Sequence, residues 1–243
     1  AQPPNWDRLA EESVNCTHAI SGHPVCCPYR ASLLTGQYPL KHGVYVNDVP
    51  LGNEATSLAQ AFASAGYDTA YIGKWHVYGS PDGVYGRRRA YVPRESRQGF
   101  AYWKAFECNH DYCNSPYFEG DDPSPKRWEG YDAIAQTRDA CEFIRGRANG
   151  ERPFLLMLSW GPPHDPYDRV PEPYKALYRD REIVLRPNVP AEHRRRAVET
   201  LRGYYAHIAA LDDCVAMLLQ ALDQSGFAGD TVLLFTSDHG DMH

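Results

Sequence analysis

Short apolar runs alternate with segments of helical period along this 243-residue chain. Three runs have the length and composition of strands, and three segments place apolar residues three and four positions apart, as one face of a helix does. Alternation of this kind predicts an α/β fold with a mostly parallel central sheet and helices on both faces. In chain order the predicted elements are the helix Glu54–Ala65, the strand Asp68–Ile72, the helix Tyr131–Arg145, the strand Phe154–Trp160, the helix Ala191–Leu222 and the strand Thr231–Phe235.

Polar side chains follow each of the three predicted strands. Lys74 and His76 follow the first strand, His164 follows the second, and Asp238 and His239 follow the third. Because open parallel sheets bind ligands beyond the carboxyl ends of their strands, we expect these side chains to converge. Cationic and imidazole groups beside a carboxylate predict a site that binds an oxyanion together with a divalent cation.

The stretch HPVCCPYRASLLTG adds a candidate nucleophile to this site. Pro28 suits the first turn of a helix and Gly36 suits the position after its end, so a short helical run over Ala31–Thr35 would have Cys26 at its N-terminus. The free backbone N–H groups there favour an anion, and Arg30 adds a fixed positive charge about one turn further on. The pattern indicates a nucleophile placed beside an oxyanion.

An ordinary thiolate nucleophile explains this spacing poorly. Thiol phosphatases separate Cys and Arg by five residues in a loop of phosphate-binding amides, whereas Cys26 and Arg30 are separated by three and Pro28 removes one amide donor. A structural metal site is also disfavoured, because Cys26 and Cys27 are adjacent and no second pair of suitably spaced thiols exists.

Four motifs together resemble the formylglycine-dependent (type I) sulfatases of the alkaline phosphatase superfamily. They are the Cys-x-Pro-x-Arg signature in CCPYRASLLTG, GKWH at 73–76, PPHDPY at 162–167 and TSDHGD at 236–241, and PNWDRLAEE near the start resembles the segment that precedes the signature. The resemblance therefore covers nearly the whole chain. Four motifs in the family's order are more specific than any single one.

The resemblance implies that a separate modifying enzyme oxidises Cys26 to formylglycine. The hydrated aldehyde would bear two geminal hydroxyls on a divalent metal ion, calcium by family resemblance, with magnesium or manganese possible. One hydroxyl would attack sulfur and release the alcohol, and the second would then be deprotonated to expel sulfate and restore the aldehyde. Cys27 and Tyr29 occupy the variable positions of the signature.

The other motif residues would support this reaction. Arg30 would steady the hydrate and His76 would contact it and assist its collapse. Lys74 and His164 would bind sulfate oxygens. The metal ligands would be Asp238, His239 and Cys26 as formylglycine.

The resemblance also implies segments that these residues do not contain. Members of the family begin with an apolar strand ending in an Asp pair that completes the metal site, and they carry another sulfate-binding Lys beyond the DHG motif. We therefore expect residues 1–243 to be one sulfatase-type catalytic domain, incomplete at both ends, with an incomplete metal site. Family resemblance favours a periplasmic or secreted protein, although this chain contains no leader peptide.

The substrate class stays open at this stage. A sulfate monoester of a small molecule or carbohydrate is the leading interpretation. Four aromatic residues of the irregular region Tyr78–Glu129 could stack on sugar rings, although packing is favoured for each. The alternatives are a phosphonate monoester or phosphodiester hydrolase and a non-catalytic binding domain. The aromatic residues are Trp103, Tyr112, Tyr117 and Trp128.

The overall composition excludes some partners. A net charge of −6 argues against a nucleic-acid-binding protein, because such proteins usually carry a basic face. No apolar run approaches the ~18 residues that a membrane-spanning helix needs. We therefore expect neither a nucleic-acid partner nor a membrane span in this chain.

Overall fold

The computed structural model describes residues 1, 3–79, 88–148, 150 and 152–241. Five strands in this part of the chain form one sheet in the order β4-β3-β2-β1-β5. β1 pairs in parallel with both β2 and β5, while β2–β3 and β3–β4 are antiparallel. The predicted α/β class is confirmed, and the sheet is mixed. Its strands are β1 (Asp68–Lys74), β2 (Tyr102–Phe106), β3 (Pro116–Glu119), β4 (Lys126–Arg127) and β5 (Phe154–Ser159).

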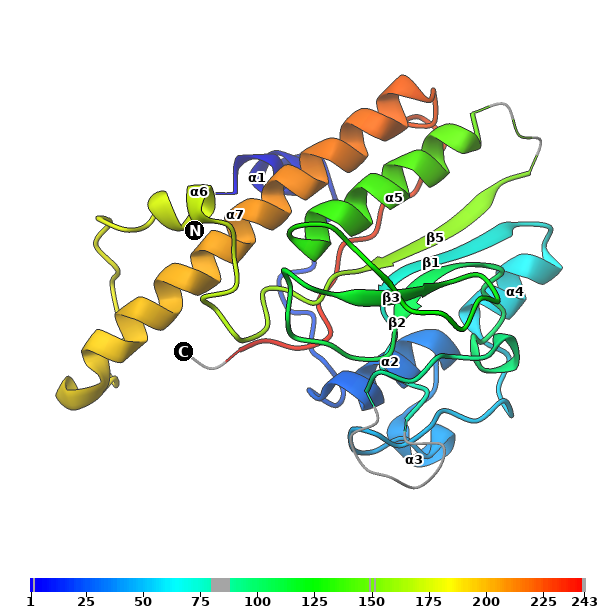
Figure 1. Ribbon diagram of the computed structural model, residues 1–243, viewed down its shortest axis with the longest axis horizontal. Coiled ribbons are helices and arrows are strands. Elements are labelled where there is room, and N and C mark those ends of the chain that lie inside the picture. Colours follow the sequence, from blue (N-terminus) through cyan, green and yellow to red (C-terminus); the bar gives the residue numbers. More distant parts are fainter. Residues whose placement is uncertain (2, 80–87, 149, 151, 242–243) are drawn as a thin grey trace.

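Helices cover both faces of the sheet (Figure 1). On one face, α5 (Asp132–Gly146) and α7 (Arg194–Gln224) pack over Ile72 and its neighbours in β2 and β5. On the other, α2 (Cys26–Thr35) and α4 (Leu58–Ser64) cover a core that contains Tyr71, Trp75 and Trp103. Shorter helices complete the layers: α1 (Pro4–Glu11), α3 (Pro39–His42), α6 (Glu172–Ala176) and the 3-10 turns Arg94–Ser96 and Ala191–His193.

The long helix α7 connects the outer layers. Its apolar side packs on α5, α1 and α6. The segment Ala191–Gln224 is long and apolar enough to cross a membrane by length and composition alone, but half of its most apolar window is buried inside the domain. That burial is typical of a core helix, because the side chains already have apolar neighbours.

The predicted helix Glu54–Ala65 forms only from Leu58 onward, as α4. The hydroxyl oxygen of Ser57 accepts a hydrogen bond from the backbone N–H of Gln60, and the Gln60 side chain accepts one from the backbone N–H of Ser57. This capping box satisfies two N–H groups that would otherwise lack partners, and so it defines where the helix begins.

Two other predictions need correction. The region Tyr78–Glu129, predicted to be irregular, contains β2, β3 and β4; residues 80–87 lie outside the described part. Phe154–Trp160 forms β5 as predicted, at an edge of the described sheet, and both of its faces pack on core residues: Leu155 and Met157 on one side, Leu156 and Leu158 on the other. Thr231–Phe235 is not a strand in this structure. Its Val232 and Leu234 side chains are exposed, because no described strand lies beside them to pair with.

Candidate active site

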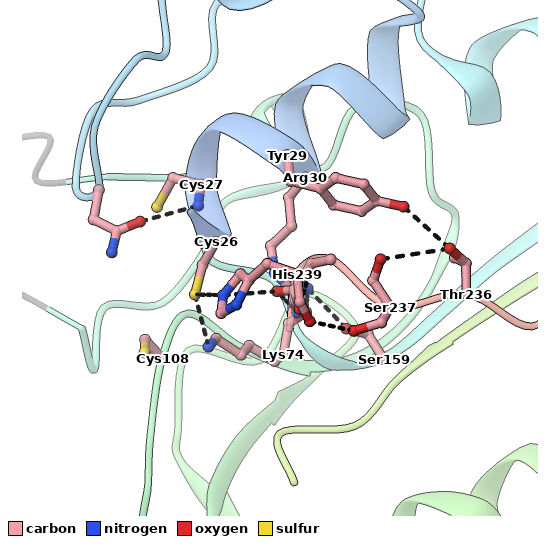
Figure 2. A network of polar contacts seen from close by, with 12 residues as sticks. Cys26, Cys27, Tyr29, Arg30, Lys74, Cys108, Ser159, Thr236, Ser237 and His239 are labelled. Carbon is pink, nitrogen blue, oxygen red and sulfur yellow. Dashed lines mark hydrogen bonds and ion pairs between the residues drawn. The ribbon is translucent and has the colours of Figure 1, made fainter. Parts of the chain in front are cut away.

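The N-terminus of α2 presents the candidate nucleophile. α2 starts at Cys26 after the extended residue Val25, and it ends before Gly36, whose φ of 66° is the left-handed conformation that glycine adopts most readily. The Cys26 Sγ atom lies 3.3 Å from the Nε2 atom of His239 and 3.8 Å from the Nζ atom of Lys74 (Figure 2). Residues from α2, β1 and the TSDHGD motif therefore meet at one sulfur atom, as the sequence predicts.

The Arg30 side chain contacts residues of three segments: β1, β5 and the TSDHGD motif. Its Nη1 atom donates hydrogen bonds of 2.8 Å to the carbonyl oxygen of Lys74 and of 2.8 Å to the Oγ atom of Ser159, and Nη2 lies 3.3 Å from Oδ2 of Asp238. Burial alone would lower the pKa of the guanidinium, but Tyr71 and Asp238 outweigh it, so the net pKa is raised. A charged, buried and multiply bonded Arg30 fixes the ends of β1 and β5 beside Asp238.

Asp238 and His239 present their donor atoms toward Cys26. His239 Nδ1 lies 2.9 Å from the carbonyl oxygen of Gly240, which only accepts, so Nδ1 carries a proton, and Nε2 presents a lone pair when the ring is neutral. Burial lowers the pKa of His239, but its hydrogen bond with Cys26 outweighs burial and raises the pKa overall. Burial raises the pKa of Asp238, but Arg30 and His239 outweigh this effect and lower it overall. Asp238 is therefore an anion at neutral pH.

These groups fit part of a divalent metal site. One ligand atom from each of Cys26, Asp238 and His239 lies within 4.8 Å of the others. The His239 lone pair and the Asp238 carboxylate are donors that divalent cations accept. Calcium usually takes about six to eight oxygen ligands, so this set supplies only part of a coordination shell.

Lys74 is the last residue of β1 and His76 lies two residues beyond it, but their side chains have different surroundings. Lys74 is buried against Cys26, whereas the Nε2 atom of His76 lies 3.8 Å from Oδ1 of Asp48. Burial, with a further contribution from Lys74, lowers the pKa of His76 far below its usual value, so the imidazole is neutral. The described contacts thus join His76 to Asp48, a buried residue that the motifs do not include.

His164 lies at the rim of the site, with 30% of its side chain exposed. Its imidazole stacks on that of His110, with ring centroids 4.4 Å apart and an angle of 11° between the planes. Burial, with Lys74 second, lowers the pKa of His110 to about 3, so His110 is neutral. The polar contacts described for the His164 imidazole are with Asp165, and none joins it to Cys26.

His110 and Glu107 come from the end of β2, a strand that sequence periodicity did not reveal. Glu107 accepts hydrogen bonds from the backbone N–H groups of Tyr78 and Gly79, and burial raises its pKa to about 7. Recognising YWKAF as a strand would have directed attention to the residues that follow it.

Cys27 faces away from these groups. Its backbone N–H donates to Oδ1 of Asn47, and the side chain packs in the core beneath α2. Burial raises the pKa of its thiol to about 12, so it is uncharged and a poor nucleophile.

Three of the four aromatic candidates for sugar stacking are core residues. Trp103, Tyr112 and Trp128 are buried, and the half-buried Tyr117 stacks on Trp128 with centroids 4.4 Å apart. These contacts agree with a packing role, which the sequence favoured for each of the four residues.

The family model described as Sulfatase matches residues 1–243. The chain belongs to the sulfatase family. This sulfatase chain is 44% identical over 239 residues to the ulvan-active sulfatase of Formosa agariphila, covering 98% of this chain and 46% of that relative. It is 32% identical to the endo-4-O-sulfatase of Bacteroides thetaiotaomicron, covering 98% of this chain and 51% of that one.

Solved structures agree with this assignment. The putative sulfatase YidJ of Bacteroides fragilis superposes with a TM-score of 0.91 at 32% identity, covering 98% of this chain and 57% of that structure. The phosphonate monoester hydrolase of Agrobacterium radiobacter shares the fold, with a TM-score of 0.64 at 23% identity, covering 94% of this chain and 56% of that one. This sulfatase chain spans about half the length of the curated relatives it matches.

Proposed function

We propose that the protein containing this chain hydrolyses sulfate monoesters, with Cys26 as the precursor of its nucleophile. The observation that carries the proposal is the position of the Cys26 side chain. It lies at the N-terminus of α2, 3.8 Å from the Lys74 ammonium and 3.3 Å from the His239 imidazole. A tetrahedral oxyanion bound at Cys26 would meet a cation and the positive end of a helix.

Formylglycine formed from Cys26 would supply, as its hydrate, two hydroxyls in place of the thiol. One would provide the oxygen that attacks sulfur as the alcohol leaves with a proton, and loss of the proton from the other would expel sulfate and restore the aldehyde. His76 would contact the hydrate and assist this collapse as a neutral hydrogen-bonding group, because the strongly lowered pKa of its imidazole makes it a weak proton acceptor.

The remaining residues bind and orient. Lys74 and His164 would bind sulfate oxygens, and Arg30 would hold the ends of β1 and β5 in place around the nucleophile. Asp238 and His239, with the modified Cys26, would bind a divalent cation, calcium by family resemblance or else magnesium or manganese. That ion would stabilise negative charge on the reacting oxygens.

The names of two relatives support a carbohydrate substrate. One is named an ulvan-active sulfatase and another an endo-4-O-sulfatase. We therefore propose a sulfated carbohydrate as substrate. The resemblance of the Cys26 signature to formylglycine-dependent sulfatases motivates two further proposals, a formylglycine-generating enzyme as a transient partner and a periplasmic or secreted location.

Mass spectrometry of the peptide that contains Cys26 tests the mechanism. We expect full-length protein made together with the modifying enzyme to show this peptide without the thiol sulfur and its hydrogen, without one Cβ hydrogen, and with one added oxygen. Cys27→Ser should keep the modification, because Cys27 is a core residue. An unmodified thiol at Cys26 in that protein would refute the mechanism and favour the non-catalytic binding domain.

A phosphonate monoester or phosphodiester substrate is the second candidate. It is motivated by 28% identity to the multifunctional alkaline phosphatase superfamily protein PehA of Trinickia caryophylli, over 98% of this chain. Turnover of an aryl sulfate should exceed turnover of the matching aryl phosphonate monoester by the full-length protein. The reverse ranking would support the second candidate.

A further inference from the structure

The loop that carries His164, residues 161–167, is held by buried side chains from two distant elements. The hydroxyl of Tyr112, in the loop between β2 and β3, donates to the carbonyl oxygens of His164 at 2.8 Å and Asp165 at 3.0 Å. The Nε2 atom of His207, on α7, lies 3.4 Å from the carbonyl oxygen of Pro166. Three consecutive backbone carbonyls therefore have side-chain partners in the core.

The direction of the His207 hydrogen bond is defined by its neighbours. A carbonyl oxygen only accepts, so Nε2 of His207 carries a proton, and Nδ1 accepts from the hydroxyl of Tyr131 at 2.6 Å. Burial lowers the pKa of His207 to about 4, which agrees with one proton on the ring at neutral pH. Tyr131, His207 and the carbonyl of Pro166 thus form one directional chain between α5 and the loop.

Close packing leaves the loop little room to shift. A Cβ atom added to Gly161 would lie 2.9 Å from the Tyr112 ring, and one added to Gly203 of α7 would lie 2.3 Å from the carbonyl oxygen of Tyr167. Atoms that close would have to move, so glycine is required at both contacts for the loop to lie this near Tyr112 and α7.

The imidazole of His164 is oriented separately from its backbone. His110 precedes Tyr112 by two residues, and its ring stacks on that of His164 with centroids 4.4 Å apart. One loop therefore holds both the main chain and the ring plane of His164, while 30% of the His164 side chain stays exposed to a ligand.

We propose that Tyr112, His207 and His110 are positioning residues that hold His164 in the geometry that binds the sulfate ester. The inference rests on the proposed function, because it takes His164 to contact sulfate oxygens. A displacement of about 1 Å in a substrate-binding group can reduce turnover by about a hundredfold. Burying polar side chains against the loop backbone is one way to prevent that displacement.

A double-mutant cycle in the full-length, Cys26-modified protein tests the proposal with an aryl sulfate as probe. Tyr112→Phe removes only the hydroxyl, and we expect kcat/KM to fall by roughly tenfold. In the His164→Ala background the same substitution should change kcat/KM by less than about twofold, because the group it positions is gone. An equal loss in both backgrounds, or wild-type activity of Tyr112→Phe, would overturn the proposal.

Tyr174→Phe is the matched control. The Tyr174 hydroxyl donates to Oδ2 of Asp213, and its ring packs in the same core cluster as Tyr112 without touching residues 161–167 in the described contacts. We expect wild-type kcat/KM from this variant. A loss equal to that of Tyr112→Phe would show a general effect of hydroxyl removal and would contradict positioning.

Two variants of His110 give an independent test that does not depend on Tyr112. His110→Phe keeps a flat ring for stacking and should retain most activity, whereas His110→Ala should lose roughly tenfold in kcat/KM with an unchanged thermal midpoint. Equal activities of the two variants would overturn the role of the stack. Wild-type protein without sulfate ester turnover would instead refute the proposed function itself.

Discussion

At the residue scale, Arg30 shows why the type of cation at a position matters. Its two terminal nitrogens reach the Lys74 carbonyl, the Ser159 hydroxyl and the Asp238 carboxylate at the same time. A lysine carries the same charge but offers a single nitrogen on a flexible stem, so it could keep at most part of this set. Arg30 is buried, which makes an unpaired partner costly.

We therefore expect Arg30→Lys to reduce both stability and activity. The loss in unfolding free energy should be about 1–3 kcal/mol, measured by urea denaturation, because lysine keeps the charge but leaves part of the buried hydrogen-bond set without a partner. Sulfate ester turnover should fall by roughly a hundredfold, because Asp238 and the ends of β1 and β5 lose their common partner. Arg195→Lys is the control, since 92% of that side chain is exposed. A stable, fully active Arg30→Lys protein would contradict the assigned role.

Unlike Arg30, His164 should affect activity without affecting stability. Its side chain is at the rim and stacks on His110, so His164→Ala should change the unfolding free energy by less than about 1 kcal/mol. Turnover of an aryl sulfate should fall by roughly a hundredfold or more if the imidazole binds a sulfate oxygen. Near-normal turnover, with circular dichroism confirming the fold, would remove His164 from the site.

The motifs located the residues that meet at Cys26 but not the residues that support them. Lys74 and His239 could be predicted because each follows an apolar run that ends at the site. Asp48 and Tyr112 could not, because their roles depend on hydrogen bonds and ion pairs across the fold that have no local spacing. Their types alone, an Asp and a Tyr in irregular segments, indicate nothing specific.

At the scale of elements, helices were easier to predict than the sheet. The predicted segment Tyr131–Arg145 agrees with α5 within one residue at each end, because many apolar positions repeat at helical spacing. β2 escaped prediction because Lys104 interrupts its short apolar pattern. The Lys104 ammonium lies 2.8 Å from a carboxylate oxygen of Asp139 on α5, a partner that only the folded structure supplies.

α7 carries a pH-dependent contribution to stability through His207. The folded pKa of about 4 lies below the usual 6.5, so between these values the unfolded chain binds more protons than the folded one. The contribution of His207 to the unfolding free energy is fully present above about pH 6.5 and is lost as the pH falls toward 4. Below about pH 4 it no longer changes with pH. Its full size is about 3 kcal/mol, since one pKa unit corresponds to about 1.4 kcal/mol.

Replacing His207 with an uncharged residue should remove that dependence. Gln offers a donor to the Pro166 carbonyl and an acceptor to the Tyr131 hydroxyl without titrating. The wild-type protein should lose more unfolding free energy than His207→Gln between pH 6.5 and 4, and the two should run parallel above pH 7. The difference in unfolding free energy between the two proteins removes the effects of other titrating groups, which are the same in both. One of them is Asp132, whose pKa is raised by burial to about 7. Parallel curves throughout would refute the assignment.

At the scale of the whole molecule, the described residues leave the sheet edge at β5 and one apolar segment uncovered. The described residues place no strand on the outer side of β5. Thr231–Phe235 has the composition of a buried strand, but 95% of Val232 and 78% of Leu234 are exposed. The composition of this segment predicts that its residues are buried. Strand formation also requires a neighbouring strand, and a short stretch of sequence does not show which segments lie beside it in the fold.

An open strand edge and an exposed apolar segment both promote association between chains. We therefore expect the isolated 243-residue chain to self-associate, with light scattering that rises with protein concentration. A Val232→Lys/Leu234→Lys variant should scatter less, because charge opposes both strand pairing and apolar contact. Val14→Lys/Val184→Lys is the matched control, because it adds the same two charges at exposed apolar positions outside this segment. Equal reduction by the control would assign the effect to net charge, and unchanged scattering of the double variant would exclude the segment 231–235 as the associating surface.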